Sequence, residues 1–233
     1  MAPNLVKLVY FQNDNVIAAP MSMIDMPFLE SVTTNFIALS NSFVTSFSAG
    51  RVNAPNLTKF LLAAEGQDTS LHLGTLLGAN PSIRNLHLQG DFDPLAQPSS
   101  QSLFRHSPPL HTLVVEKASR KFLQALSSAD QDGLPLVLPN LSFLKVECGR
   151  TTTAVMTAAE FDTLYRSRCV LGPDEKLTHI GAKQLEHFSF ATHDALLPGT
   201  REAIERRMKC VRHFENERLL LFRWDANPLQ PGE

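Results

Sequence analysis

One short phrase recurs along this 233-residue chain and constrains the fold more than any other feature. In each copy an apolar residue is followed three and five positions later by two more, and most copies carry a proline two residues before the first. Periods of this kind are typical of solenoids, in which each turn buries its apolar face against the next. From Leu57 onward, the first positions lie 26, 27, 31 and 44 residues apart. Clear copies begin at Leu5, Leu57, Ile83, Leu110, Leu141 and Leu185, and a weak one at Val44.

The phrase predicts a strand at the same place in every copy. Successive side chains of a strand point to opposite faces, so the last two apolar residues enter the core while their neighbours face outward. A proline just before the strand removes no ladder hydrogen bond. We therefore predict parallel strands at residues 7–10, 59–62, 85–88, 112–115, 143–146 and 187–190. Their buried column is Leu8, Phe60, Leu86, Leu113, Leu144 and Phe188.

Segments between the phrases predict short helices. Thr157 and Glu160 form a capping box ahead of Phe161 and Leu164, which share one helix face. Two further short helices are predicted after Ser119 and around Leu73 to Leu77. Another is predicted from Asp25, with Phe28, Val32 and Phe36 on one stripe, and another from Thr200 through Met208 to Val211. The segment from Arg218 to Trp224 is predicted to be a closing strand. We expect an α/β fold, an irregular leucine-rich-repeat solenoid with a parallel sheet on one face and helices or loops on the other. Residues 1–233 are expected to form a single domain.

Composition excludes several classes of protein. The 21 basic and 23 acidic side chains give a net charge of −2, so no nucleic-acid partner is expected. No apolar stretch approaches the roughly 20 residues of a membrane span. Three widely spaced cysteines (Cys148, Cys169 and Cys210) indicate buried thiols in a reducing compartment, the cytoplasm or the nucleus. No catalytic, metal or cofactor motif is recognised, so we expect no enzyme, no metal and no cofactor; an enzyme on an unrecognised α/β fold is the minority alternative.

The open face of the sheet is the predicted partner site, because the residues flanking each central apolar position must point away from the core. Basic, imidazole and apolar side chains mix there, which suits a protein surface better than a nucleic acid or a small molecule. Phe143, exposed among polar neighbours, is the type of anchor that dominates interface energetics; the alternative is a loop that covers Phe143 and Leu61. The predicted partner-binding residues are Lys7, Lys59, Leu61, Asn85, His87, Thr112, Val114, Phe143, Lys145 and His187.

Three segments resemble the C-terminal leucine-rich region of fungal F-box proteins: Ala54-Pro55-Asn56-Leu57, Leu138-Pro139-Asn140-Leu141 and the helix end Tyr165-Arg166-Ser167-Arg168-Cys169. The resemblance covers nearly the whole chain. It implies a substrate-recognition region that holds a target protein for an SCF-type ubiquitin ligase, whose adaptor binds a separate F-box.

Met26-Pro27-Phe28-Leu29-Glu30 echoes the start of an F-box without the helical pattern that should follow. We therefore expect this chain to lack an N-terminal F-box or polar cap, and expect the adaptor of a cullin-type ligase to bind only if an F-box precedes this sequence. The alternative function is a leucine-rich-repeat scaffold or GTPase regulator unrelated to ubiquitin.

Overall fold

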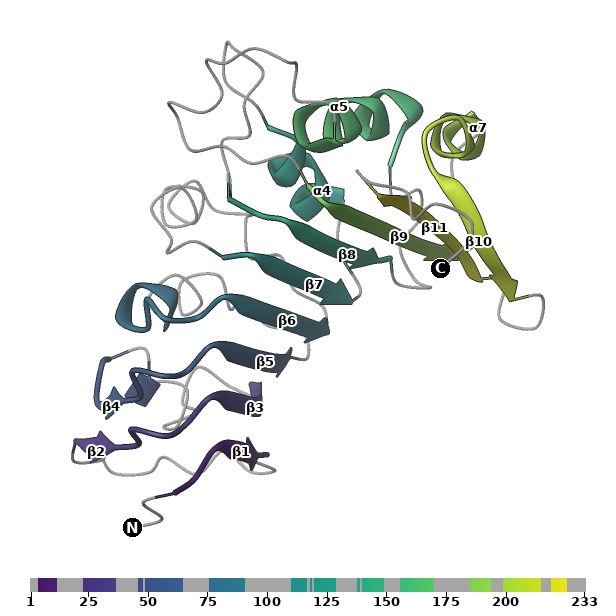
Figure 1. Cartoon of the computed structure of the whole chain (residues 1–233). Helices are drawn as coiled ribbons and strands as arrows, with labels where there is room; N and C mark the ends of the chain where they lie inside the picture. The colour runs from purple at the N-terminus through teal and green to yellow at the C-terminus, as the bar shows by residue number, and fades with distance from the viewer. Residues whose placement is uncertain are drawn as a thin grey trace, which may run out of the picture. The chain divides into compact units, whose positions relative to one another are not determined.

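The computed structural model describes residues 4–11, 23–36, 46–47, 49–64, 76–90, 110–116, 118, 120–128, 138, 140–148, 156–169, 185–193, 199–214 and 219–225. The chain is organised in two compact units, residues 1–116 (unit 1) and 117–233 (unit 2). The fold belongs to the mixed α/β class, with mostly parallel strands and few helices among the described residues (Figure 1). The solenoid and the single domain stay predictions.

The described part of unit 1 contains a sheet of five parallel strands in the order β1–β3–β5–β6–β7. Neighbouring strands pair at equivalent positions of the phrase, so Phe60 lies beside Leu86, and Leu86 beside Leu113. At the start of each strand of this sheet after β1, two consecutive N–H groups donate to one carbonyl that precedes the neighbouring strand. Thr58 O, for example, accepts from Arg84 N and Asn85 N, both at 2.9 Å. The strands are β1 (Lys7–Tyr10), β3 (Ser31–Phe36), β5 (Lys59–Ala64), β6 (Asn85–Gly90) and β7 (Thr112–Glu116), with β2 (Ile24–Asp25) and β4 (Val52–Asn53) forming a separate parallel pair.

The helix predicted from Asp25 is wrong, because residues 31–36 form strand β3. Leu29, Val32 and Thr34 are fully buried and follow the spacing of the phrase after Pro27. With this copy the first positions of the phrase begin 24 residues (5 to 29) and then 28 residues (29 to 57) apart, which removes the longest gap between copies. The F-box-like letters at 26–30 are therefore the turn that leads into a repeat strand.

Two other short predictions in unit 1 have mixed outcomes. Phe47, in the weak copy that begins at Val44, is fully buried but belongs to a helical turn at 46–47; Val44 itself lies outside the described residues. The helix expected around Leu73 to Leu77 is seen at 76–79, and residues 71–75 lie outside the described part.

The described strands of unit 2 follow the order β8–β9–β11–β10. Strands β8 and β9 are parallel, as predicted, whereas β11 pairs antiparallel with both β9 and β10. The capping box is confirmed: Glu160 N donates to Thr157 Oγ1 at 3.2 Å, and Thr157 N donates to Glu160 Oε2 at 2.7 Å. The elements are α4 (Arg120–Ser127), β8 (Phe143–Glu147), α5 (Ala158–Cys169), β9 (His187–His193), α7 (Thr200–Glu205), β10 (Lys209–Phe214) and β11 (Leu219–Asp225).

The helix predicted from Thr200 is too long. It ends at Glu205, Met208 is buried beyond its end, and Val211 lies in strand β10. A strand prevails there because residues 209–214 gain a ladder of hydrogen bonds with β11. The closing strand is confirmed as β11, at 219–225.

In each unit, the largest buried side chains of the sheet lie on one face; in unit 2, Ser189 and Ala191 of β9 are buried on the other face as well. In unit 1, Val32, Phe60, Leu86 and Leu113 are buried side by side, and Leu8 is half-buried at the edge. In unit 2, Leu144 and Phe188 pair in the same way, so the predicted buried column exists within each unit. Burying such a side chain stabilises the fold by roughly 1.5–3 kcal/mol. The opposite face is therefore held rigidly in register. No helix among the described residues is long and apolar enough to cross a membrane.

Candidate functional site

Two rows of side chains cross the open face of the unit 1 sheet, one residue from each strand in each row. The alternation of the strands produces them, because the residues on either side of the buried central position share the outer face. The polar row contains Lys7, Ser31, Lys59, Asn85 and Thr112. The mixed row, one pleat further along, contains Val9, Thr33, Leu61, His87 and Val114.

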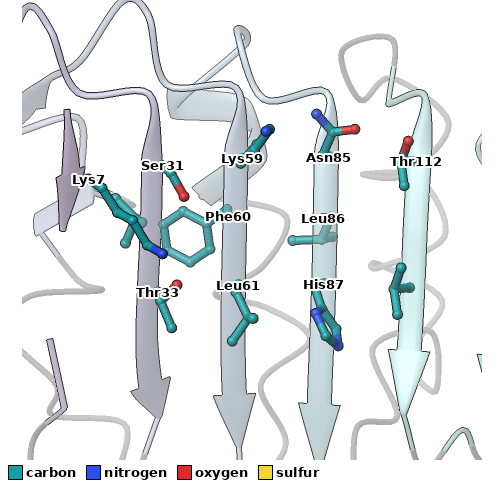
Figure 2. Close-up of a pocket in the computed structure, with 12 residues that line it drawn as sticks. Lys7, Ser31, Thr33, Lys59, Phe60, Leu61, Asn85, Leu86, His87 and Thr112 are labelled. Atoms are coloured by element: carbon teal, nitrogen blue, oxygen red, sulfur yellow. The ribbon is translucent and has the colours of Figure 1, made fainter. Parts of the chain in front are cut away.

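A shallow groove of about 230 Å³ lies on this face (Figure 2). It is lined by the polar row, by the mixed row except Val9, and by Val32, Phe60 and Leu86 of the buried column. The groove thus brings together a large part of the predicted site. The predicted residues that line it are Lys7, Lys59, Leu61, Asn85, His87, Thr112 and Val114.

The charges of the groove are unevenly distributed. Lys7 and Lys59 are exposed, and no carboxylate of the described residues lies within ion-pair distance of either ammonium group. At the other end, His87 Nε2 lies 2.9 Å from Glu116 Oε1, so the imidazole there already has a carboxylate partner. The β1–β5 end is therefore cationic, and the β6–β7 end carries a paired imidazole.

Phe143, Lys145 and His187 belong to unit 2. Phe143 is half-buried rather than exposed, because its ring stacks on His187 with centroids 4.5 Å apart and an interplanar angle of 11°. His187 Nδ1 lies 2.6 Å from Asp225 Oδ1, and Arg223 Nε donates to Asp225 Oδ2 at 2.7 Å. Burial raises the pKa of Asp225, but the hydrogen bonds and charges of His187 and Arg223 outweigh it and hold that pKa below its ordinary value.

Several residues of these faces were missed from the sequence. Ser31 and Thr33 line the groove but belong to the unrecognised copy, whose signal was Pro27 followed by the spacing of Leu29 and Val32. Glu116, the carboxylate partner of His87, was missed because no local pattern links residues 29 positions apart.

The burial of the three cysteines determines which thiols a reagent can reach. Cys148 and Cys169 are buried as expected, and burial raises the pKa of both thiols. Cys210 is exposed, which corrects the expectation of three buried thiols; it lies on β10, whose described ladder partner is β11 alone. No group of three or more His, Cys, Asp or Glu side chains in the described ranges could hold a metal ion.

Comparison with known proteins finds no matching family model, no matching curated protein and no matching solved structure. What can be said about function therefore rests on the geometry of the unit 1 groove and on the residues that line it.

Proposed function

We propose that this chain is a protein-binding module, without catalysis of its own, whose target rests on the groove of unit 1. The observation that carries the proposal is the combination of the exposed Lys7 and Lys59 with the half-buried Leu61 and Val114 on one sheet face. Polar groups beside partly exposed apolar groups on a pre-ordered backbone are what a protein interface requires, since little conformational entropy is then lost on binding.

Other ligand classes fit this face less well. Small-molecule sites are clefts of about 300–1,000 Å³ that enclose most of the ligand, whereas this groove is shallow and smaller. A nucleic acid would be held by many phosphate contacts, whereas the groove offers two lysines in a chain of net charge −2.

The resemblance to F-box proteins supports a more specific form of the proposal. In that form, the groove holds a target protein for an SCF-type ubiquitin ligase in the cytoplasm or the nucleus. The adaptor of the cullin-type ligase then binds an F-box joined to this sequence. The test is to read the coding sequence upstream of Met1: an in-frame F-box there supports this form, and an upstream sequence without one contradicts it.

The binding proposal itself is tested by selecting peptides from a random 12-residue display library on the immobilised full chain. The affinity of each enriched peptide is then measured for the wild type, Leu61→Ser and the matched control Leu221→Ser, which makes the same change at a half-buried leucine of the unit 2 sheet. Because Leu61 is already half-buried, a partner covers only part of its side chain, so Leu61→Ser should cost about 0.7–1.5 kcal/mol. Binding should then weaken roughly three- to tenfold. The control should change it less than about twofold. Failure to enrich any peptide, or equal binding to both variants, would contradict the proposal.

A further inference from the structure

Lys7 and Lys59 lie two strands apart on the polar row, with Ser31 between them. Adjacent strands are about 4.8 Å apart, so the two Cα atoms are separated by about 10 Å. Figure 2 shows the Lys7 side chain extending from β1 toward β3, with Lys59 and Asn85 at the same end of the neighbouring strands. The two ammonium groups, the Ser31 hydroxyl and the Asn85 amide therefore supply hydrogen-bond donors on the β1–β6 part of this face.

The mixed row supplies a different surface one pleat away. Leu61 and Val114 are both half-buried, and His87 between them is paired with Glu116. A ligand that crosses the strands therefore meets cationic donors along one side and apolar groups along the other. The five strands span about 19 Å, and an extended peptide rises about 3.3 Å per residue, so a segment of about six residues matches the groove in length.

We propose, resting on the proposed function, that the target is an extended acidic segment of another protein, which lies across β1 to β7. Its Asp or Glu carboxylates bind Lys7 and Lys59, and an apolar side chain packs on Leu61 and Val114. Charge complementarity selects this occupant, because both ammonium groups lack a carboxylate partner among the described residues. No arginine lines the groove, so its cations are two lysine ammonium groups, which bind an anion as point charges and not through a bidentate fork.

The test uses the peptides enriched on the full chain and measures their affinities by fluorescence anisotropy. Enriched peptides should be acidic, and replacing their Asp and Glu by Asn and Gln should weaken binding. Lys7→Gln combined with Lys59→Gln should weaken binding roughly two- to thirtyfold, as two exposed ion pairs allow. The matched control Lys209→Gln, at an exposed lysine on β10 of unit 2, should change affinity less than twofold. Raising sodium chloride from 50 to 300 mM should weaken wild-type binding and affect the double variant much less.

The outcomes separate this inference from the proposed function. Peptides that need Leu61 but are neutral or basic, and are indifferent to the double lysine variant, would overturn the acidic segment and leave the binding module in place. Phosphoserine versions that bind more than tenfold tighter than the Asp or Glu peptides would also overturn it, in favour of phosphate. If no enriched peptide depends on Leu61, both proposals fail.

Discussion

Glu160 joins the first turn of α5 to α4, and we predict that Glu160→Ala destabilises unit 2 by about 2 kcal/mol. Its Oε1 accepts hydrogen bonds from Arg120 Nη2 at 2.8 Å and from Gln124 Nε2 at 2.6 Å. Its Oε2 accepts the Thr157 N–H at 2.7 Å and completes the capping box. The change removes the side-chain half of the capping box, an ion pair and a negative charge at a helix N-terminus, while Thr157 Oγ1 still accepts the N–H of residue 160.

The magnitude follows from these contacts. Loss of the hydrogen bond that Thr157 N donates to the carboxylate costs about 1 kcal/mol, and a carboxylate in the first helical turn contributes about 0.3–1 kcal/mol. The ion pair adds only the lower part of 0.2–1 kcal/mol, because the Arg120 side chain is 47% exposed. Burial raises the pKa of Glu160, but the hydrogen bonds from Arg120, Thr157 and Gln124 outweigh it and lower that pKa from 4.5 to about 2. Because the folded pKa lies below the unfolded one, this stabilisation is complete above about pH 4.5 and is lost as the pH falls toward 2.

Urea unfolding followed by Trp224 fluorescence measures this effect. Trp224 is the sole tryptophan, and its ring lies 6.0 Å, edge-on, from that of Tyr165 on α5, so its emission reports on unit 2. Glu202→Ala is the matched control, since it removes an exposed first-turn carboxylate of α7. The isosteric Glu160→Gln should differ from the wild type at pH 7 and much less at pH 3. Two results would show that the contacts of Glu160 do not stabilise unit 2. One is a loss of unfolding free energy in Glu160→Ala no larger than that in Glu202→Ala. The other is a stability difference between Glu160→Gln and the wild type that is the same at both pH values.

Three further predictions follow from burial. Leu86→Ala should lower the free energy of unfolding of unit 1 by about 2–5 kcal/mol through lost contacts and a cavity, seen as faster amide hydrogen exchange across β5 and β6. Arg168→Met should destabilise unit 2 by about 2–4 kcal/mol, measured by Trp fluorescence in urea, because the fully buried guanidinium supplies three hydrogen bonds to backbone carbonyls. A thiol reagent should modify Cys210 in the folded protein, and Cys148 and Cys169 only after unfolding; rapid modification of all three would refute the buried placement.

Strand positions could be predicted because the repeated phrase couples burial to fixed positions. The copy at β3 was missed for a physical reason. Phe28, Val32 and Phe36 are four residues apart, a spacing that fits one face of a helix and, being even, one face of a strand. Thr34 stands where other copies carry an apolar residue, so the sequence pattern alone does not indicate a strand. The pairing of β3 with β1 and β5 in the structure identifies it.

The open face was predictable in outline, and its chemistry was not. Alternation at period two determines that Lys59, Leu61 and His87 share a face, whatever the rest of the chain does. Which side chains are paired depends on contacts distant in sequence, such as His187 with Asp225, 38 residues later. The buried Arg168 likewise donates hydrogen bonds to Leu126 O, 42 residues earlier, and no local sequence pattern predicts this contact.

The claim that a protein segment binds the groove of unit 1 is tested most directly by chemical-shift mapping of the full chain with an enriched acidic peptide. The largest shift changes should fall on the amides and methyl groups of Leu61 and Val114 and on the imidazole of His87. Unit 2, reported by Lys209 and Leu221, should change little. Shift changes confined to unit 2, or absent from β5, β6 and β7 at saturating peptide, would contradict the assignment of the site.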